Sequence, residues 1–146
     1  MRETDGIYEY ICVYVDDLMM ASEHGYKLKG DGDLKYHLGC DFGQDPDGTY
    51  YYGPFKYVEK MLDAYERLFG EKPMGYSSPL EKGDHLQLDM SPELNEEGRA
   101  IYMSLVGQSQ WLISLGRFDC AIMTMSRFRA APREGHMTRM KEFMGT

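Results

Sequence analysis

The stretch Tyr10–Ser22 (YICVYVDDLMMAS) constrains the fold most, because it sets two adjacent carboxylates between two short apolar runs. Ile11–Val15 consists of strand-favouring residues whose apolar side chains fall on both faces, as expected for a strand buried on both sides. A second apolar run, Leu18–Ala21, follows at once. The pattern predicts a tight hairpin that carries Asp16 and Asp17 at its tip.

Two interpretations of this carboxylate pair stay open on the residues alone. The nearest basic residue along the chain is Lys27, and two like charges about 5 Å apart at an effective dielectric of about 20 repel by roughly 3 kcal/mol. A divalent cation removes that penalty, and carboxylate oxygens are the ligands that Mg²⁺ prefers. Turn chemistry is the alternative, since Asp tolerates unusual backbone angles and hydrogen-bonds its own backbone.

The length and composition of the chain suit one domain or a piece of a larger protein. It has 146 residues, of which 42% are hydrophobic, and it contains no apolar run near the ~20 residues that span a bilayer, so we expect no membrane segment. Cys12, Cys40 and Cys120 form neither a disulfide framework nor a zinc pattern, so we expect buried thiols in a reducing compartment.

The net charge of −8 counts against a free-standing nucleic-acid binder. The charge is uneven, however, because residues 117–146 hold six Lys and Arg against three Asp and Glu. A carboxylate-rich part and a basic part are therefore expected.

Downstream of the hairpin, the sequence predicts two further strands and then helices, which is an α+β fold. Leu34–Phe42 is expected as one strand, and Gly43–Gly48 as the turn that joins it to a strand at Thr49–Tyr52. Lys56–Phe69 has the apolar spacing of a helix, and Gly70 is a natural stop.

The opposite face of that helix carries Lys56, Lys60 and Arg67, which is typical either of a solvated surface or of a surface that contacts a phosphate backbone. Further helices are expected over the following segments: one starting at Ser91-Pro92-Glu93, then Gly98–Leu115, Asp119–Arg129 with Asp119 as its cap, and Gly135–Met144. Trp111 and most of the twelve methionines are expected in the core.

Several motifs resemble reverse transcriptases, and YVDDLMMAS is most similar to the branch of copia-type LTR retrotransposons. LKYHLGCDF resembles the first arm of that family's primer-grip hairpin, and YMSLVGQSQWLISLGRFDCAIMTMSRF and HMTRMKEFMGT are similar to the family's segments that precede RNase H. Taken in order, the similar motifs cover nearly all of residues 8–146.

The resemblance implies a truncated polymerase palm in residues 1–55, with a YVDD hairpin and a primer-grip-like hairpin. Residues 56–146 are implied to form a mainly helical thumb or connection region. The implied activity is RNA-directed DNA synthesis on an RNA or DNA template–primer with dNTP. The implied partners are the remainder of a Pol polyprotein, including integrase and RNase H, in a cytoplasmic particle.

Residue roles follow from the resemblance. Asp16 and Asp17 are implied to be catalytic and to bind two Mg²⁺ ions, with Mn²⁺ as a possible substitute, together with an aspartate on an upstream strand. Tyr14 and Val15 are implied to lie beside the primer terminus. Leu38 and Gly39 are implied to grip the primer, and Lys56, Lys60 and Arg67 to lie near its backbone.

Two departures from the family pattern bear on activity. Only seven residues precede Tyr8, so the strand with the third aspartate is expected to be absent, and Glu23–Asp33 is too short for the family's helix at that place. We therefore expect residues 1–146 not to polymerise by themselves. The alternatives are a non-catalytic retroelement remnant, or a co-opted module in which helices within residues 98–144 bind protein or nucleic acid.

Overall fold

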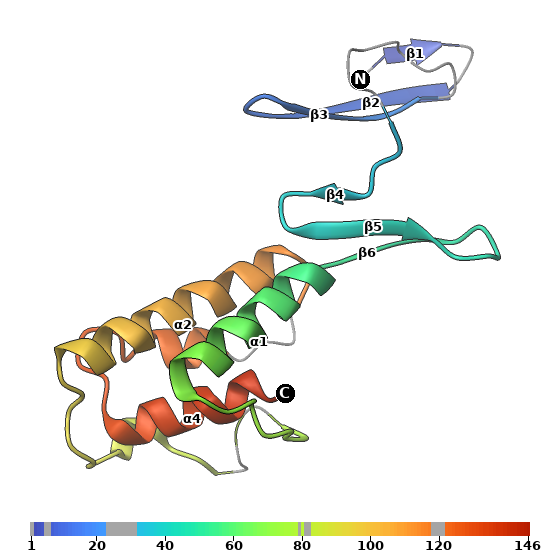
Figure 1. Cartoon of the computed structure of the whole chain (residues 1–146). Coiled ribbons are helices and arrows are strands. Elements are labelled where there is room, and N and C mark those ends of the chain that lie inside the picture. Colours follow the sequence, from blue (N-terminus) through green and yellow to red (C-terminus); the bar gives the residue numbers. More distant parts are fainter. Residues whose placement is uncertain (1, 5–6, 23–31, 79, 81–82, 118–121) are drawn as a thin grey trace.

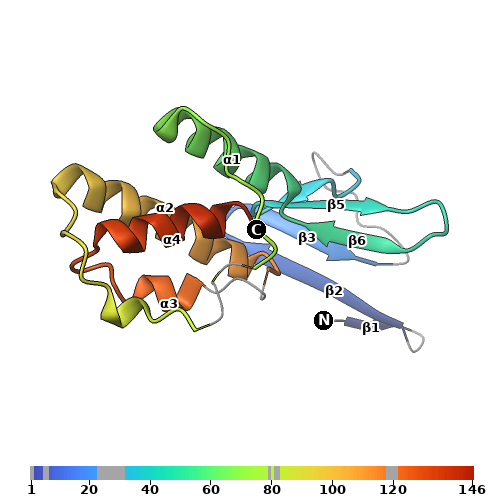
Figure 2. The ribbon, with the colours of Figure 1, turned by 90° about the horizontal axis from the view of Figure 1, so that it is seen from below.

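The computed structural model describes residues 2–4, 7–22, 32–78, 80, 83–117 and 122–146. They form a small α+β fold with two three-stranded antiparallel sheets, in the orders β1-β2-β3 and β4-β5-β6, and four α-helices. In Figures 1 and 2 the strands gather at one side of the molecule and the helices at the other. The elements are β1 (Arg2–Thr4), β2 (Ile7–Tyr14), β3 (Asp17–Ala21), β4 (Tyr36–His37), β5 (Cys40–Gln44), β6 (Tyr50–Gly53), α1 (Phe55–Phe69), a 3₁₀ turn η1 (Leu86–Leu88), α2 (Glu96–Ser114), α3 (Ile122–Ser126) and α4 (Glu134–Met144).

The first sheet contains the predicted hairpin. β2 and β3 pair antiparallel, and the last pair, Tyr14 with Asp17, leaves Val15 and Asp16 as a two-residue loop. The prediction that this strand is buried on both sides is wrong. Ile11 is 48% exposed and Val13 67%. Figure 1 shows the reason, because the sheet lies at the end of the molecule away from the helices, so no helix covers it within the described ranges.

The second sheet differs from the predicted single strand over Leu34–Phe42. The chain turns back at Leu38 and Gly39, whose φ angles are 50° and 92°, so that β4 and β5 form a hairpin of their own. Two positive φ angles in a two-residue loop are the mark of a type I′ turn. The hairpin between β5 and β6 around Asp47-Gly48 is confirmed, with register pairs from Asp41–Gly53 to Gln44–Tyr50.

The predicted helices are largely confirmed. α1 ends at Gly70, which adopts the left-handed φ of 73° expected of a C-terminal glycine. The helix predicted at Gly98–Leu115 is α2, which begins at Glu96 because Asn95 is its cap and accepts a hydrogen bond from the Gly98 amide at 2.8 Å. The separate helix predicted to start at Ser91-Pro92-Glu93 is wrong, since these residues are not helical and Glu93 forms an isolated bridge with Arg133. Ser91 caps α4 instead, since its Oγ accepts the Gly135 amide at 2.8 Å. The predicted cap Asp119 lies outside the described residues.

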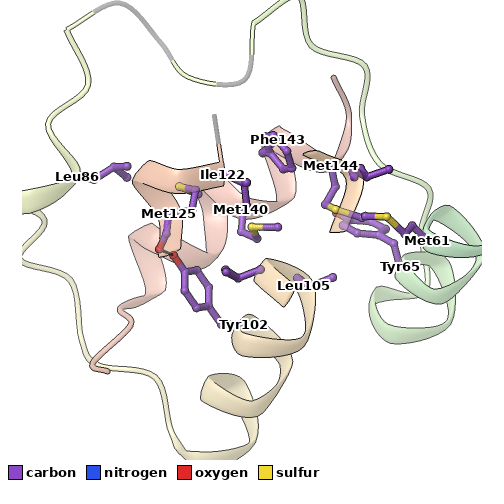
Figure 3. Packing of buried hydrophobic residues seen from close by; sticks show 12 residues of the cluster. Met61, Tyr65, Leu86, Tyr102, Leu105, Ile122, Met125, Met140, Phe143 and Met144 are labelled. Atoms are coloured by element: carbon purple, nitrogen blue, oxygen red, sulfur yellow. Dashed lines mark hydrogen bonds between the residues drawn. The ribbon is translucent and has the colours of Figure 1, made fainter. Parts of the chain in front are cut away.

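The core lies between the helices (Figure 3). It combines methionine, aromatic and aliphatic side chains from α1, α2, α3 and α4, together with Leu86 of η1. The side chains with no exposed surface include Tyr102, Leu105, Ile122 and Met140. Methionine fills the core at Met61, Met125, Met140 and Met144. The expectation that most methionines lie in the core is wrong, because Met74, Met90, Met103 and Met123 are exposed.

The expectations for Trp111 and for the cysteines agree only in part with the structure. Trp111, expected in the core, is 42% exposed on α2. Cys40 is buried as expected and its thiol lies 3.8 Å from the Leu115 carbonyl, whereas Cys12 is exposed; Cys120 lies outside the described residues. No helix in the described ranges has the length and apolar character that crossing a membrane requires.

Candidate functional site

The tip of the β2–β3 hairpin holds a residue in an unfavourable backbone conformation. Val15 has a φ of 55°, and Asp16, the other loop residue, has no positive φ. A positive φ at the first loop residue and a negative φ at the second are typical of a type II′ turn, whose first position favours glycine. A β-branched residue there is an outlier, and such strain costs about 1–3 kcal/mol and collects at functional sites. Val15 is also 85% exposed, so its side chain recovers little energy by burial.

The two carboxylates stand beside this strained residue and are both exposed. Asp16 lies in the loop, and Asp17 begins β3 with its side chain 64% exposed. The imidazole of His37 lies beside Asp17, with its Nδ1 3.9 Å from Asp17 Oδ2. In water the repulsion between two charges about 5 Å apart falls to about 0.8 kcal/mol. The repulsion between the two carboxylates therefore does not by itself require a cation, and the larger penalty expected from the sequence does not apply.

The donor set at the tip fits one kind of metal site and not another. Mg²⁺ is usually bound through one or two carboxylates, several waters and substrate phosphates. Asp16 and Asp17 fit that pattern. Within the described residues, no group of three His, Cys, Asp or Glu side chains is placed to hold a metal ion. The residues present therefore do not fit a closed centre with two metal ions.

The predicted grip residues lie in the second hairpin, at its turn against α2. A Cβ atom on Gly39 would lie 3.2 Å from Leu115 Cδ1 and 3.3 Å from the Trp111 indole nitrogen, and its φ is also positive, so the position requires glycine. Leu38 is 38% exposed at the same turn. The structure gives this turn a packing role that the sequence did not indicate.

The three predicted cations of α1 are all exposed, but Lys56 is already paired. Its Nζ lies 2.9 Å from Asp41 Oδ1 and 5.4 Å from the centre of the Tyr36 ring, and its backbone amide donates to Asp41 Oδ2 at 2.8 Å. These hydrogen bonds hold the pKa of Asp41 below its usual value and raise the pKa of Lys56. Lys60 and Arg67 have no ion pair within the described part of the chain.

The structure does not bring the whole predicted set together. Tyr14, Val15, Asp16 and Asp17 share the tip of the first hairpin. In Figure 1 the second sheet lies between that hairpin and α1, which carries the three cations. The candidate residues therefore lie in three places: the hairpin tip, a surface made by the second sheet and the start of α1, and the last turn of α1, which carries Arg67.

Sequence reasoning missed two surface features. One is a cleft of about 640 Å³ between α1, the end of α4 and residues 72–77, with Met61, Leu62, Tyr76, Phe143 and Met144 among its lining. The other is a set of exposed aromatic rings on the second sheet, for which the run TYYYGPFKY at residues 49–57 was an available signal.

Comparison with known proteins gives no match: no protein-family model, no curated protein and no solved structure matches this chain. The geometry of the hairpin tip and of the second sheet is therefore the basis for assigning a function, together with the resemblance of the sequence motifs.

Proposed function

We propose that this chain is part of a copia-type reverse transcriptase, in which the β2–β3 hairpin contributes Asp16 and Asp17 to a magnesium site. In this proposal residues 1–55 are the palm part, and the helices are the thumb or connection part. The second hairpin and α1 contact a template–primer. The remainder of a Pol polyprotein and a cytoplasmic particle are the proposed setting.

One observation carries the proposal. The two-residue loop presents Asp16 and Asp17 to solvent directly after Val15, a β-branched residue at a φ of 55°. A turn with no function could relieve this strain with glycine or asparagine at no loss. Strain kept at an acidic tip supports a role in which the position of the carboxylates matters.

The exposed apolar side chains of β2 and β3 also support the proposal. Tyr8, Tyr10, Ile11, Val13 and Leu18 are 48–67% exposed. Exposed apolar surface of this extent is typical of an element that other protein covers. A hairpin that belongs to a larger polymerase domain has this property.

The role of the hairpin residues in the proposal is to bind and orient. Asp16 and Asp17 would hold a Mg²⁺ ion, which when bound supplies charge neutralisation for nucleotide phosphates. Tyr14 is 52% exposed beside Asp17 and would contact the primer terminus. Because no third carboxylate joins the pair within the described residues, we propose that residues 1–146 do not polymerise by themselves.

Paramagnetic broadening by Mn²⁺ tests the metal site. In an amide NMR spectrum of the full chain, substoichiometric Mn²⁺ is expected to broaden the signals around Val15–Leu18 first. Asp16→Asn/Asp17→Asn should abolish that broadening. The matched control is Asp45→Asn/Asp47→Asn in the other acidic turn, which should leave it unchanged. Broadening no stronger at the hairpin tip than at the Asp45–Asp47 turn would refute the proposal and favour the remnant interpretation.

Primer extension tests the proposed lack of independent activity. The purified chain, given a primed template, dNTP and Mg²⁺ or Mn²⁺, is expected to add no nucleotides. Extension that Asp16→Ala abolishes would contradict this part of the proposal, and it would mean that the third ligand is present in the chain.

A further inference from the structure

One face of the β4–β5–β6 sheet carries exposed aromatic rings beside cationic side chains. Cross-strand partners share a face of a sheet, so the register pairs Tyr36–Asp41, Asp41–Gly53 and Gly43–Tyr51 identify its members. Phe55, the first residue of α1, lies over the same face. We call this surface the aromatic face and define it by Tyr36, Asp41, Gly43, Tyr51, Gly53, Phe55 and Lys56.

Two glycines make room for the rings. A Cβ atom on Gly43 would lie 2.3 Å from the Tyr51 hydroxyl oxygen, and one on Gly53 would lie 2.9 Å from Phe55 Cζ. Each ring therefore occupies the space directly above a glycine. The ring centres are 6.3 Å apart and the ring planes meet at 77°, so Tyr51 and Phe55 form a corner.

The corner is open to solvent. Tyr51 is 44% exposed and Phe55 57%, so each ring offers part of its surface to a ligand. A flat ring that stacks on one of them meets the other at its side. Planar, apolar faces of this size and polar edges are features of nucleic-acid bases.

The charges beside the corner nearly balance, and Lys60 is the cation available to a phosphate. The Lys56–Asp41 pair is neutral as a unit, and Lys60, one turn further along α1, is near enough for its charge to lower the pKa of Asp41. Glu59 is also close, and its negative charge slightly raises the pKa of Lys56. The surface as a whole is close to neutral, so stacking should contribute more to binding than charge.

The opposite face of the same sheet packs against the protein itself near the end of α2. Tyr52 stacks on Phe42 with ring centres 6.0 Å apart and planes at 25°. A Cβ atom on Gly116 would lie 3.6 Å from the Tyr52 ring, so this face meets the end of α2. Tyr50, on that face and 80% exposed, is therefore a matched control for Tyr51 on the same strand.

We propose that the aromatic face binds single-stranded nucleic acid by stacking a base in the corner of Tyr51 and Phe55, with Lys60 beside the adjacent phosphate. The proposal rests on the proposed function, because it adds a base-stacking contact for the strand that a reverse transcriptase would hold. It predicts little sequence preference, since every base has a face that can stack.

Fluorescence anisotropy with the full chain tests the stacking. The probes are labelled (dT)₁₂ and a 12-mer abasic strand of equal charge. The chain is expected to bind (dT)₁₂ more tightly than the abasic strand. Tyr51→Ala/Phe55→Ala should weaken (dT)₁₂ binding by about 5- to 150-fold for each stacked base lost. Tyr50→Ala should leave binding unchanged, and circular dichroism confirms that each variant folds.

The contribution of Lys60 has its own readout. For single strands the slope of log K against log salt changes by about 0.7 for each phosphate contact. Lys60→Ala should reduce the slope by that amount, whereas Lys72→Ala, at the cleft beyond the other end of α1, should not change it.

The outcomes separate this inference from the proposed function. Equal binding of (dT)₁₂ and the abasic strand, or unchanged binding in Tyr51→Ala/Phe55→Ala, would overturn the inference; if Mn²⁺ still broadened the hairpin tip, the proposed function would stand. The reverse result, base-dependent binding that requires Tyr51 and Phe55 without Mn²⁺ at the tip, would support the inference and describe a nucleic-acid-binding module.

Discussion

Replacing Tyr102 with phenylalanine tests the packing of α2 against α3 through one hydrogen bond. The Tyr102 side chain has no exposed surface, and its hydroxyl donates to the Met125 carbonyl at 2.8 Å. That carbonyl also accepts the Phe128 amide at 3.2 Å, so the variant does not leave it without a partner. The expected loss at pH 7 is therefore about 1 kcal/mol in the free energy of unfolding, the usual net value of one hydrogen bond.

Alkaline pH should reverse the order of stability. Burial raises the pKa of Tyr102 from 10.0 to about 12, because the phenolate is poorly solvated in the core. A raised pKa in the folded state contributes stability that is fully present below pH 10 and is lost as the pH rises toward 12. At about 1.4 kcal/mol for each pKa unit, the loss reaches roughly 1.4 kcal/mol at pH 11. Tyr102→Phe has no such loss, so the two stability curves should cross near pH 10.7, an estimate from the same relation.

Urea unfolding followed by circular dichroism at pH 7, 9, 10 and 11 measures both effects. The other tyrosines titrate equally in the native chain and the variant, so the difference between the two reports on Tyr102 alone. Tyr50→Phe, at an 80% exposed position, is the control and should follow the native chain at every pH. A constant difference between Tyr102→Phe and the native chain from pH 7 to pH 11 would refute the reasoning, because it would mean that the phenol is not buried.

Four other substitutions test separate parts of the structure. Val15→Gly should slow amide hydrogen exchange in β2 and β3, since it releases about 1–3 kcal/mol of strain against about 0.5–1 kcal/mol of added chain entropy; faster exchange would mean that the turn is unstrained. Leu105→Ala should lower the free energy of unfolding by about 2–5 kcal/mol in urea, and a loss below 1 kcal/mol would contradict its full burial. Asn95→Ala should cost about 1 kcal/mol in the same assay through loss of the α2 cap, and Asn95→Asp should restore it. Lys56→Met should raise the pKa of Asp41 part of the way toward 3.8 in an NMR titration, because it removes the ammonium but keeps the backbone amide that donates to Asp41 and lowers its pKa most. The stability linked to Asp41, which is present above that pH and lost as the pH falls, should be reduced accordingly; an unchanged pKa would exclude the ion pair.

The helices were predictable because their signals are local. In α1 the apolar side chains recur at helical spacing, and Gly70 supplies the left-handed residue at the end, so both bounds agree with the structure to within one residue. The first hairpin was predictable for a similar reason, since the polar pair Asp16-Asp17 interrupts two apolar runs. In both cases neighbours in the sequence decide the conformation.

The second hairpin was not predictable in the same way. The usual sequence signal of a type I′ turn is Asn-Gly or Gly-Gly. Here Leu38 occupies the first position with a φ of 50°. The turn is stabilised from outside, because Gly39 packs on Leu115 and Trp111 of the α2 end. The same applies to Ser91, which looks like a local cap but caps α4, 44 residues further along the chain.

The sequence by itself determined most of the helices and the hairpin with Asp16 and Asp17 at its tip. Only the tertiary structure decided that Ile11 and Val13 face solvent, that Asp41 neutralises Lys56, and that Tyr51 and Phe55 share an open corner. The physical reason is that backbone conformation follows mainly from neighbouring residues, whereas burial and charge pairing depend on which distant surfaces meet.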